Sequence, residues 1–250
     1  MKNNISMSLL LLLASIFAMS PFAIDSYLSA IPVIADDLNT QTSLVAVTVS
    51  IYILGLAMGQ LLGGPLSDRW GRRPSTILGL LVFAIGSVLL ANVQSIEMLW
   101  IWRIVQSIGG GIAVVNVPAI IRDNAIGKEA ARLFSLIALI MMIAPAIAPT
   151  IGTVILHTLS WHWIFIMLSL VAVIVAIAAF RIMPDTKRAK KVKPSGGFLS
   201  VLKERRALGY LIAQGFGYAV MMTFIANAPF AYIEHFHVSP ELFSGLFIAN

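Results

Sequence analysis

Two ionisable side chains lie inside long apolar stretches of this sequence. Asp25 is in the first of these stretches, and Arg103 is in the fourth. Ionisable groups are costly at bilayer depth, and they usually mark a substrate or proton pathway. At the helical rise of about 1.5 Å per residue, we expect Asp25 about 13 Å and Arg103 about 8–9 Å from the outer surface. These similar depths are compatible with one shared cavity, although the sequence does not show that the two helices are neighbours.

A carboxyl group in such a position can carry a proton. Loss of water favours the neutral form of a carboxyl group, whereas a nearby arginine favours the ionised form. A group balanced between these effects takes up a proton on one side of the membrane and releases it on the other. We therefore predict that Asp25 is a proton-carrying site. Two structural alternatives stay open: Asp25 caps a kink near Pro21 or faces a water-filled mouth, and Arg103 extends past Trp100 and Trp102 to the interface.

The composition places the chain in a lipid bilayer. Of its 250 residues, 59% are hydrophobic and 11% are charged, and the mean hydropathy is +0.92, whereas soluble domains are about 25% charged. A spanning helix needs about 20 apolar residues, and the sequence holds seven complete candidates. We place them at residues 8–34, 43–66, 75–91, 98–121, 133–157, 161–183 and 207–233, and an eighth begins near residue 240. The predicted fold is an all-α integral membrane protein.

The basic residues predict the orientation of these spans. Apart from Arg103, every Lys and Arg lies at the N-terminus or between spans two and three, four and five, or six and seven. The alternate loops carry Asp36, Asp37, Glu97 and Glu234 and no basic residue. Because basic loops face the cytoplasm, we expect a cytoplasmic N-terminus and an uncleaved first helix. Basic residues distributed in this way indicate membrane topology and not a nucleic-acid-binding surface.

The spans fall into two groups separated by a polar stretch. We predict an N-terminal six-helix lobe over residues 1–183, a basic cytoplasmic linker over 184–206, and an incomplete second lobe over 207–250. The second lobe would hold helix seven and the start of helix eight. The linker either contacts anionic lipid headgroups or is a solvated loop that sets the topology. Its basic cluster consists of Lys187, Arg188, Lys190, Lys191 and Lys193.

A charged motif joins the second and third spans. Residues 64–74 read Gly-Pro-Leu-Ser-Asp-Arg-Trp-Gly-Arg-Arg-Pro, and we expect them to form a short turn. The pattern resembles the signature loop between helices two and three of the major facilitator superfamily of secondary transporters. This resemblance implies a six-helix bundle followed by a second bundle, and a latch that closes the cytoplasmic side; in a simpler alternative, Asp68 only pairs with Arg69 or Arg72 at the surface. The gate residues would be Gly64, Asp68, Arg69, Gly71, Arg72 and Arg73.

Two further motifs lie in spans four and five. Arg103, with Gln106 three residues later and a run of glycines beyond, resembles the fourth-helix motif of the same superfamily. That resemblance implies that Arg103 takes part in proton coupling. Pro145, Pro149 and Gly152 in span five resemble the fifth-helix motif of the exporters, although two of that motif's glycines are absent. Ordinary helix packing explains these three residues equally well.

Other polar side chains in the spans are candidates for lining a substrate cavity, although a neighbouring helix can equally satisfy each of them. The sequence has no Cys, and its four His have no carboxylate cluster beside them, so we predict no metal site and no cofactor. No convergent Ser/His set or carboxylate pair is present at depth, so an enzyme is not expected. The cavity candidates are Tyr27, Tyr52, Gln106, Gln214, Tyr218 and Asn227.

Local patterns narrow the resemblance to one branch of the superfamily. Residues 21–32, 121–123 and 228–236 resemble the bicyclomycin and chloramphenicol resistance (Bcr/CflA) branch of the drug:proton antiporters. This resemblance implies a bacterial inner-membrane protein that exports small-molecule drugs, including antibiotics, in exchange for protons, and that is a monomer at full length. Its partners would be the drug, protons and the lipid bilayer. Two alternatives stay open: a proton-coupled metabolite importer and a non-transporting truncated remnant.

Overall fold

The computed structural model describes residues 6–184, 203–239, 242–243 and 246. Short connections join helices throughout these residues, and none of them lies in a strand. Seven helical segments are long and apolar enough to cross a membrane, which confirms the predicted seven spans and the all-α membrane fold. The predicted eighth span lies almost entirely outside the described residues.

The bundle begins at Ser6, whose Oγ accepts a hydrogen bond from the backbone N–H of Leu9 (3.2 Å) and so caps the first helix. The elements in chain order are α1 (Met7–Asp25), η1 (Leu28–Ala30), α2 (Ile31–Asp37), α3 (Thr42–Trp70), α4 (Arg72–Leu90), α5 (Ile96–Val114), α6 (Asn116–Asn124), α7 (Lys128–Thr158), α8 (Trp161–Ile182), α10 (Arg205–Pro229) and η2 (Phe230–His235).

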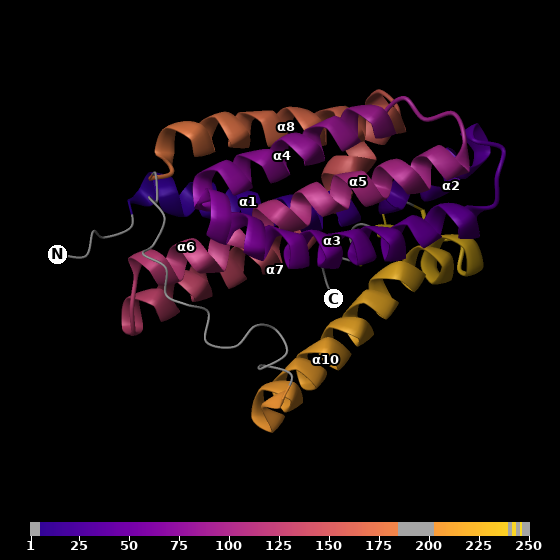
Figure 1. The fold of residues 1–250 in the computed structure, drawn as a ribbon. Helices are drawn as coiled ribbons and strands as arrows, with labels where there is room; N and C mark the ends of the chain where they lie inside the picture. The colour runs from indigo at the N-terminus through magenta and orange to yellow at the C-terminus, as the bar shows by residue number, and fades with distance from the viewer. Residues whose placement is uncertain (1–5, 185–202, 240–241, 244–245, 247–250) are drawn as a thin grey trace.

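Helices α1 to α8 pack side by side with their axes roughly aligned (Figure 1). Helix α5 packs against both α3 and α4, α4 also packs on α8, and α1 packs on α7 and α8. Helix α10 runs obliquely away from this bundle and meets it at α3 (Figure 1). The arrangement therefore places α5, which carries Arg103, in the interior of the bundle.

Glycines allow α5 to lie close to both of its neighbours. A Cβ atom on Gly59 of α3 would lie 2.9 Å from Cα of Ile108, and one on Gly63 would lie 2.9 Å from Cα of Ile112. On the α4 side, a Cβ atom on Gly86 would lie 2.8 Å from Cα of Gln106. Larger residues at these positions would push the helices apart, so glycine sets the spacing of the three central helices.

Two of the predicted spans are not continuous helices. The first breaks after Asp25 into η1 and α2, and the fourth breaks at Val115 between α5 and α6. Each break lies just before a proline, Pro32 or Pro118. Proline has no backbone N–H to donate to the carbonyl four residues earlier, and its ring crowds that carbonyl. The predicted spans over residues 8–34 and 98–121 are therefore confirmed as Met7–Asp37 and Ile96–Asn124, each made of more than one helix.

Residues 64–74 do not form the predicted turn. Helix α3 continues to Trp70, α4 begins at Arg72, and Gly71 alone connects them. Gly71 has a φ of 99°, which glycine adopts easily because it has no Cβ atom. Backbone hydrogen bonding does not require apolar side chains, so the helix runs past the end of the apolar stretch and stops at this glycine.

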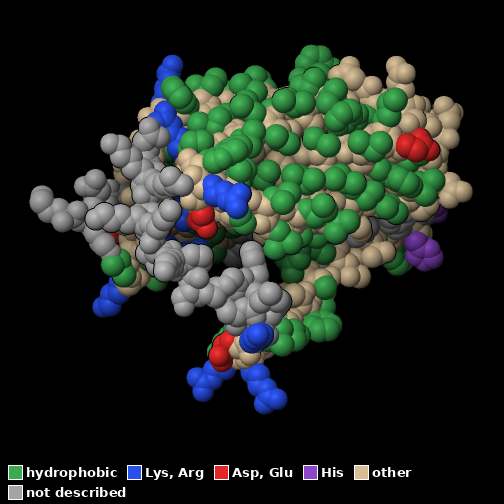
Figure 2. Space-filling model, in the orientation of Figure 1, with side chains coloured by type: hydrophobic (Ala, Val, Ile, Leu, Met, Phe, Trp, Pro, Cys, Tyr) green, Lys and Arg blue, Asp and Glu red, His purple; other side chains and the backbone are tan. Residues whose placement is uncertain are grey.

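Charged residues separate toward the ends of the bundle, and hydrophobic side chains cover much of the face seen in Figure 2. We call the end that carries Arg69, Arg72, Arg73 and Lys128 the basic end. We call the opposite end, which carries Asp37, the acidic end; there Trp161 Nε1 of α8 donates to Asp37 Oδ2 (3.1 Å). An apolar belt between two charged ends is what a membrane-spanning bundle requires.

Candidate functional site

Arg103 is the largest fully buried side chain among the described residues. Its Nη1 donates to the carbonyl oxygen of Ala23 on α1 (3.1 Å) and to Oε1 of Gln106 one turn along α5 (2.9 Å). The side chain therefore points into the bundle, and the alternative in which it extends to the interface is wrong. Through Ala23 the guanidinium is linked to the chain two residues before Asp25.

Aromatic rings surround the Arg103 guanidinium. Its Cζ atom lies 4.1 Å from the ring centroid of Tyr27, 5.3 Å from that of Tyr52 and 5.3 Å from that of Phe165. A cation over an aromatic face is stabilised by the negative face of the ring, and more strongly where water is excluded. Arg103 forms no ion pair with any carboxylate that the structure describes. The charge is thus held by rings and neutral acceptors.

A chain of hydrogen bonds connects Arg103 to α4. Gln106 accepts from Arg103, and its Nε2 donates to Oγ of Ser87 (2.8 Å). Ser87 Oγ in turn donates to the carbonyl oxygen of Phe83 (2.8 Å). All the polar side chains in this chain are buried, so a change at one member alters the partners available to the next.

Asp25 is buried where α1 ends, with 2% of its surface exposed. Its Oδ1 has no hydrogen-bond partner among the described residues. Tyr218 of α10 lies close enough to Asp25 for the two side chains to interact electrostatically. Discontinuous helices near the middle of a membrane commonly form transport sites, and Asp25 lies at such a break.

Several buried polar atoms of the bundle make no hydrogen bond within the described part of the chain. A buried polar group without a partner costs about 1–3 kcal/mol and needs an explanation. A Cβ atom on Gly110 would lie 3.3 Å from Oη of Tyr52 and 3.5 Å from Oγ of Ser20, so these two hydroxyls share one locality. The unpartnered atoms are Ser20 Oγ, Asp25 Oδ1, Ser29 Oγ, Tyr52 Oη, Arg103 Nε, Arg103 Nη2 and Asn116 Oδ1.

The structure divides the predicted cavity residues into two sets. Tyr27, Tyr52 and Gln106 are buried around Arg103, and Tyr27 Oη also bonds to the carbonyl oxygen of Val45 (3.1 Å) and to Thr48 Oγ1. Of the three candidates on α10, Gln214 and Asn227 are exposed, whereas Tyr218 is half-buried and close enough to Asp25 and Tyr52 to interact electrostatically with both. Asn227 Nδ2 donates to the carbonyl oxygen of Thr223 on its own helix (2.7 Å).

The motif of span five lies against the break that follows Asp25. Pro145 and Pro149 are both inside α7, which runs through them as one helix. A Cβ atom on Gly152 would collide with the carbonyl oxygen of Ser26. Gly152 therefore permits α7 to pack on α1 at the residue next to Asp25.

The gate motif forms a second cluster, at the basic end. Arg72 Nη1 donates to Asp68 Oδ1 (3.0 Å) and to Ser67 Oγ (2.7 Å), and Arg72 Nε donates to Asp123 Oδ2 of α6 (3.1 Å). Arg69 is exposed, and Arg73 stacks on Phe180 of α8, 4.4 Å from the ring centroid. Of the two partners expected for Asp68 at the surface, Arg72 is the one that the structure shows.

Sequence reasoning missed several members of these clusters. Ser87 and Phe165 come from helices that no motif connects to Arg103, and Ser67 lies within the motif of residues 64–74 but was not among the predicted gate residues. Ser87 was the most accessible to prediction, because it is a polar residue within an apolar span beside Gly86. Among the described residues, no three His, Asp or Glu side chains gather closely enough to hold a metal ion.

Comparison with protein families and curated proteins agrees with this architecture. The model of the Major Facilitator Superfamily matches residues 11–250. A bicyclomycin resistance protein homolog of Haemophilus influenzae is 32% identical over 247 residues, which are 96% of this chain and 62% of that protein. A chloramphenicol resistance protein of Pseudomonas aeruginosa is 33% identical over 183 residues, 70% of this chain and 44% of that protein. The chain thus spans less than two thirds of the length of these relatives, which belong to the branch predicted from the sequence.

Solved transporters have the same fold. The crystal structure of a D-xylose-proton symporter aligns with a TM-score of 0.69 over 97% of this chain and 64% of that protein, at 19% identity. A bacterial homolog of the human lysosomal transporter Spinster aligns with a TM-score of 0.72 over 96% of this chain and 57% of that protein, at 17% identity. Together with the family match and the seven spans, these findings show that the chain is a multi-pass membrane protein that belongs to the major facilitator superfamily, a family of transporters and not of enzymes.

Proposed function

We propose that this chain belongs to a secondary transporter that exports small-molecule drugs across a bacterial inner membrane in exchange for protons. The observation that carries the proposal is the buried charge of Arg103, held by groups from α1, α3, α5 and α8 next to the break at Asp25. Charged residues inside a membrane bundle are costly and mark ion pathways. The drug-resistance names of the relatives support drugs as the substrate class.

In this proposal Asp25 carries the proton. It would load when the site opens to the outside and release when the site opens to the cytoplasm. Each proton that moves down the membrane potential supplies about 2.3 kcal/mol per 100 mV. Arg103 would hold the end of α1 through the Ala23 carbonyl. A rearrangement at the break would therefore change the hydrogen bonds of Arg103 and of the residues bonded to it.

The proposed layout has an N-terminal lobe over residues 1–183, a linker over residues 184–206 and the start of a second lobe over residues 207–250. Residues 185–202 of the linker lie outside the described part of the chain. Helix α10 runs away from the α1–α8 bundle, which supports this division (Figure 1). The basic end faces the cytoplasm, in agreement with the positive-inside rule. The Arg72 cluster at that end then acts as the latch that closes the cytoplasmic side.

The test is drug export by cells that express the gene encoding this chain, with Asp25→Asn beside Asp25→Glu. The asparagine removes the proton-binding group at nearly constant volume, whereas the glutamate keeps it. We expect Asp25→Asn to accumulate ethidium or chloramphenicol as vector-only cells do, and Asp25→Glu to keep part of the export. A protonophore should abolish export by the wild type. Undiminished proton-driven export by Asp25→Asn would refute the role of Asp25, and proton-driven accumulation in place of export would refute the direction.

A further inference from the structure

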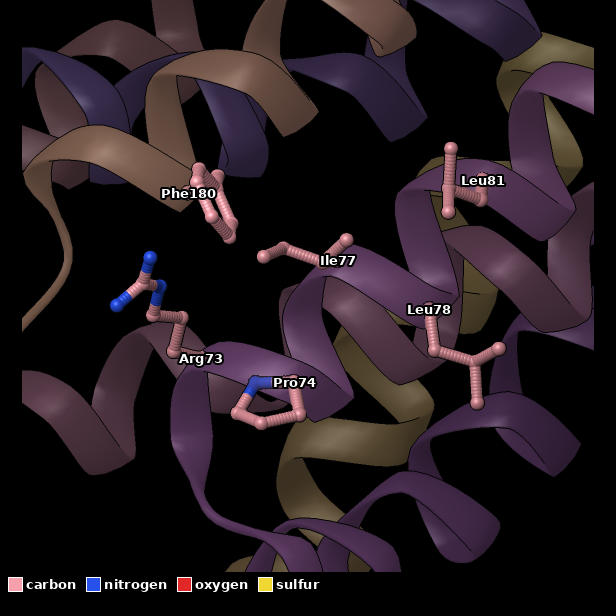
Figure 3. Close-up of a pocket in the computed structure, with 6 residues that line it drawn as sticks. All are labelled: Arg73, Pro74, Ile77, Leu78, Leu81 and Phe180. Atoms are coloured by element: carbon pink, nitrogen blue, oxygen red, sulfur yellow. The ribbon is translucent and has the colours of Figure 1, made fainter. Parts of the chain in front are cut away.

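A groove opens between α4 and α8 at the basic end of the bundle (Figure 3). Its volume is about 580 Å³. Of the lining residues that the structure describes, five come from α4 and one comes from α8, and Arg73 is the only charged one among them. The lining residues are Arg73, Pro74, Ile77, Leu78, Leu81 and Phe180.

The groove is charged at one end and apolar along its length. Figure 3 shows Arg73 beside Phe180 at one end, and Ile77, Leu78 and Leu81 following along α4. The Arg73 guanidinium stacks on the Phe180 ring, 4.4 Å from its centroid. A guanidinium stacked on a ring keeps its positive charge, and that charge attracts the phosphate of a lipid headgroup. At the helical rise, the eight-residue step to Leu81 extends about 12 Å.

The groove lies on the outer surface of the bundle. Phe180 is 63% exposed and Leu81 is 43% exposed, and both belong to helices that are long and apolar enough to span a membrane. The exposed residue next to Phe180 on α8 is Arg181, a second positive charge at the same end. A groove in this place faces lipid along its apolar part and the headgroup layer at its basic end.

We propose that this groove is a binding site for one anionic phospholipid, with the phosphate on Arg73 and an acyl chain along Ile77, Leu78 and Leu81. The charge complementarity and the length of the apolar wall favour a lipid over a soluble anion, which would use Arg73 alone. The proposal does not depend on the direction or the substrate of transport, because it rests on the surface of α4 and α8 and not on the Arg103 network.

The test is native mass spectrometry of the purified chain in detergent, titrated with phosphatidylglycerol or with phosphatidylcholine of the same acyl chains. We expect the wild type to bind phosphatidylglycerol more tightly, and Arg73→Gln to weaken that binding about fivefold, the contribution of one basic residue near a membrane surface. Arg132→Gln is the matched control, because Arg132 is exposed on α7, carries the same charge and does not line the groove. Phosphatidylglycerol binding by this control should equal that of the wild type.

A second variant tests the apolar wall without a change of charge. Leu78→Trp fills the groove, so we expect it to weaken the binding of both lipids while Arg73 is kept. Inorganic phosphate added at millimolar concentration should not displace phosphatidylglycerol. The proposal is overturned if Arg73→Gln and Arg132→Gln have equal effects, if Leu78→Trp binds both lipids as the wild type does, or if phosphate displaces the lipid.

Discussion

Arg103 and Arg72 occupy opposite environments within one bundle. Arg103 has no exposed surface, and it bonds to a backbone carbonyl and an amide oxygen between aromatic rings. The Arg72 side chain is 22% exposed and pairs with two carboxylates, Asp68 and Asp123, at 3.0 and 3.1 Å. The two residues share the same charge and the same hydrogen-bonding geometry, so the difference between them lies in their surroundings.

The two environments differ in what they cost the folded protein. A buried charge loses its hydration, and that cost is not recovered in full by the contacts it makes. An exposed ion pair contributes about 0–1 kcal/mol, so the Arg72 cluster can form and break at little cost. The comparison supports the proposal that Arg103 serves transport at the expense of stability, and that Arg72 is suited to a contact that opens and closes.

The largest expected effect is that of Arg103→Met. Methionine fills a similar volume without charge, so the cost of burying the guanidinium is removed. The Ala23 carbonyl oxygen and Gln106 Oε1 lose their donor, however, at about 1–3 kcal/mol each. Because these effects oppose each other, we expect drug export to fall to background while the free energy of unfolding in detergent changes little. Export assays and thermal unfolding of the same variant check both parts. Arg103→Lys is the control that keeps the charge, and it should retain more export than the methionine; a variant that exports like the wild type, or that fails to fold, would break the comparison.

The contrast also shows which features of the fold and the site can be predicted from the sequence. Apolar length and the arrangement of basic loops predicted seven spans, because these properties depend on the bilayer and not on packing. The Arg103–Gln106 contact follows from helical spacing of three residues. The Gln106–Ser87 contact does not, because it depends on how closely α4 and α5 approach at Gly86.

The basic end shows a similar limit. The motif in residues 64–74 indicated which residues belong together, but not that Gly71 alone joins the two helices. The Arg72–Asp123 pair joins residues 51 positions apart, and it exists only because α6 ends beside the start of α4. The spans were predicted from apolar length, which does not show the breaks before Pro32 and Pro118, although proline chemistry favours a break at such positions.

A smaller effect is expected within the buried network, from Ser87→Ala. This change removes the acceptor of Gln106 Nε2, and a buried donor without a partner costs about 1–3 kcal/mol. Ser135→Ala is the matched control, because Ser135 Oγ also donates to the carbonyl four residues earlier on its own helix (3.0 Å) but is exposed. Thermal unfolding should show a loss of stability for Ser87→Ala and not for Ser135→Ala. Equal losses of stability would mean that the hydrogen bonds from Arg103 through Gln106 to Ser87 do not stabilise the fold more than an exposed serine does.

The smallest effect on stability is expected at the basic end, from Asp123→Asn. The ion pair with Arg72 is exposed, so its loss should lower the free energy of unfolding by about 0–1 kcal/mol, and less at high salt. A double-mutant cycle with Asp68→Asn measures how the two carboxylates share Arg72. A loss above about 2 kcal/mol that persists at high salt would place the Arg72 cluster in the same energetic class as the buried network.

Proton release on drug binding tests most directly the claim that the buried site at Asp25 and Arg103 couples a proton to a drug. Drug is added to the purified protein in lightly buffered detergent solution, and the pH change is followed for the wild type, Asp25→Asn and Asp123→Asn. The account predicts that the wild type and Asp123→Asn release protons and that Asp25→Asn, although it folds, releases none. Equal proton release from Asp25→Asn and the wild type would contradict it.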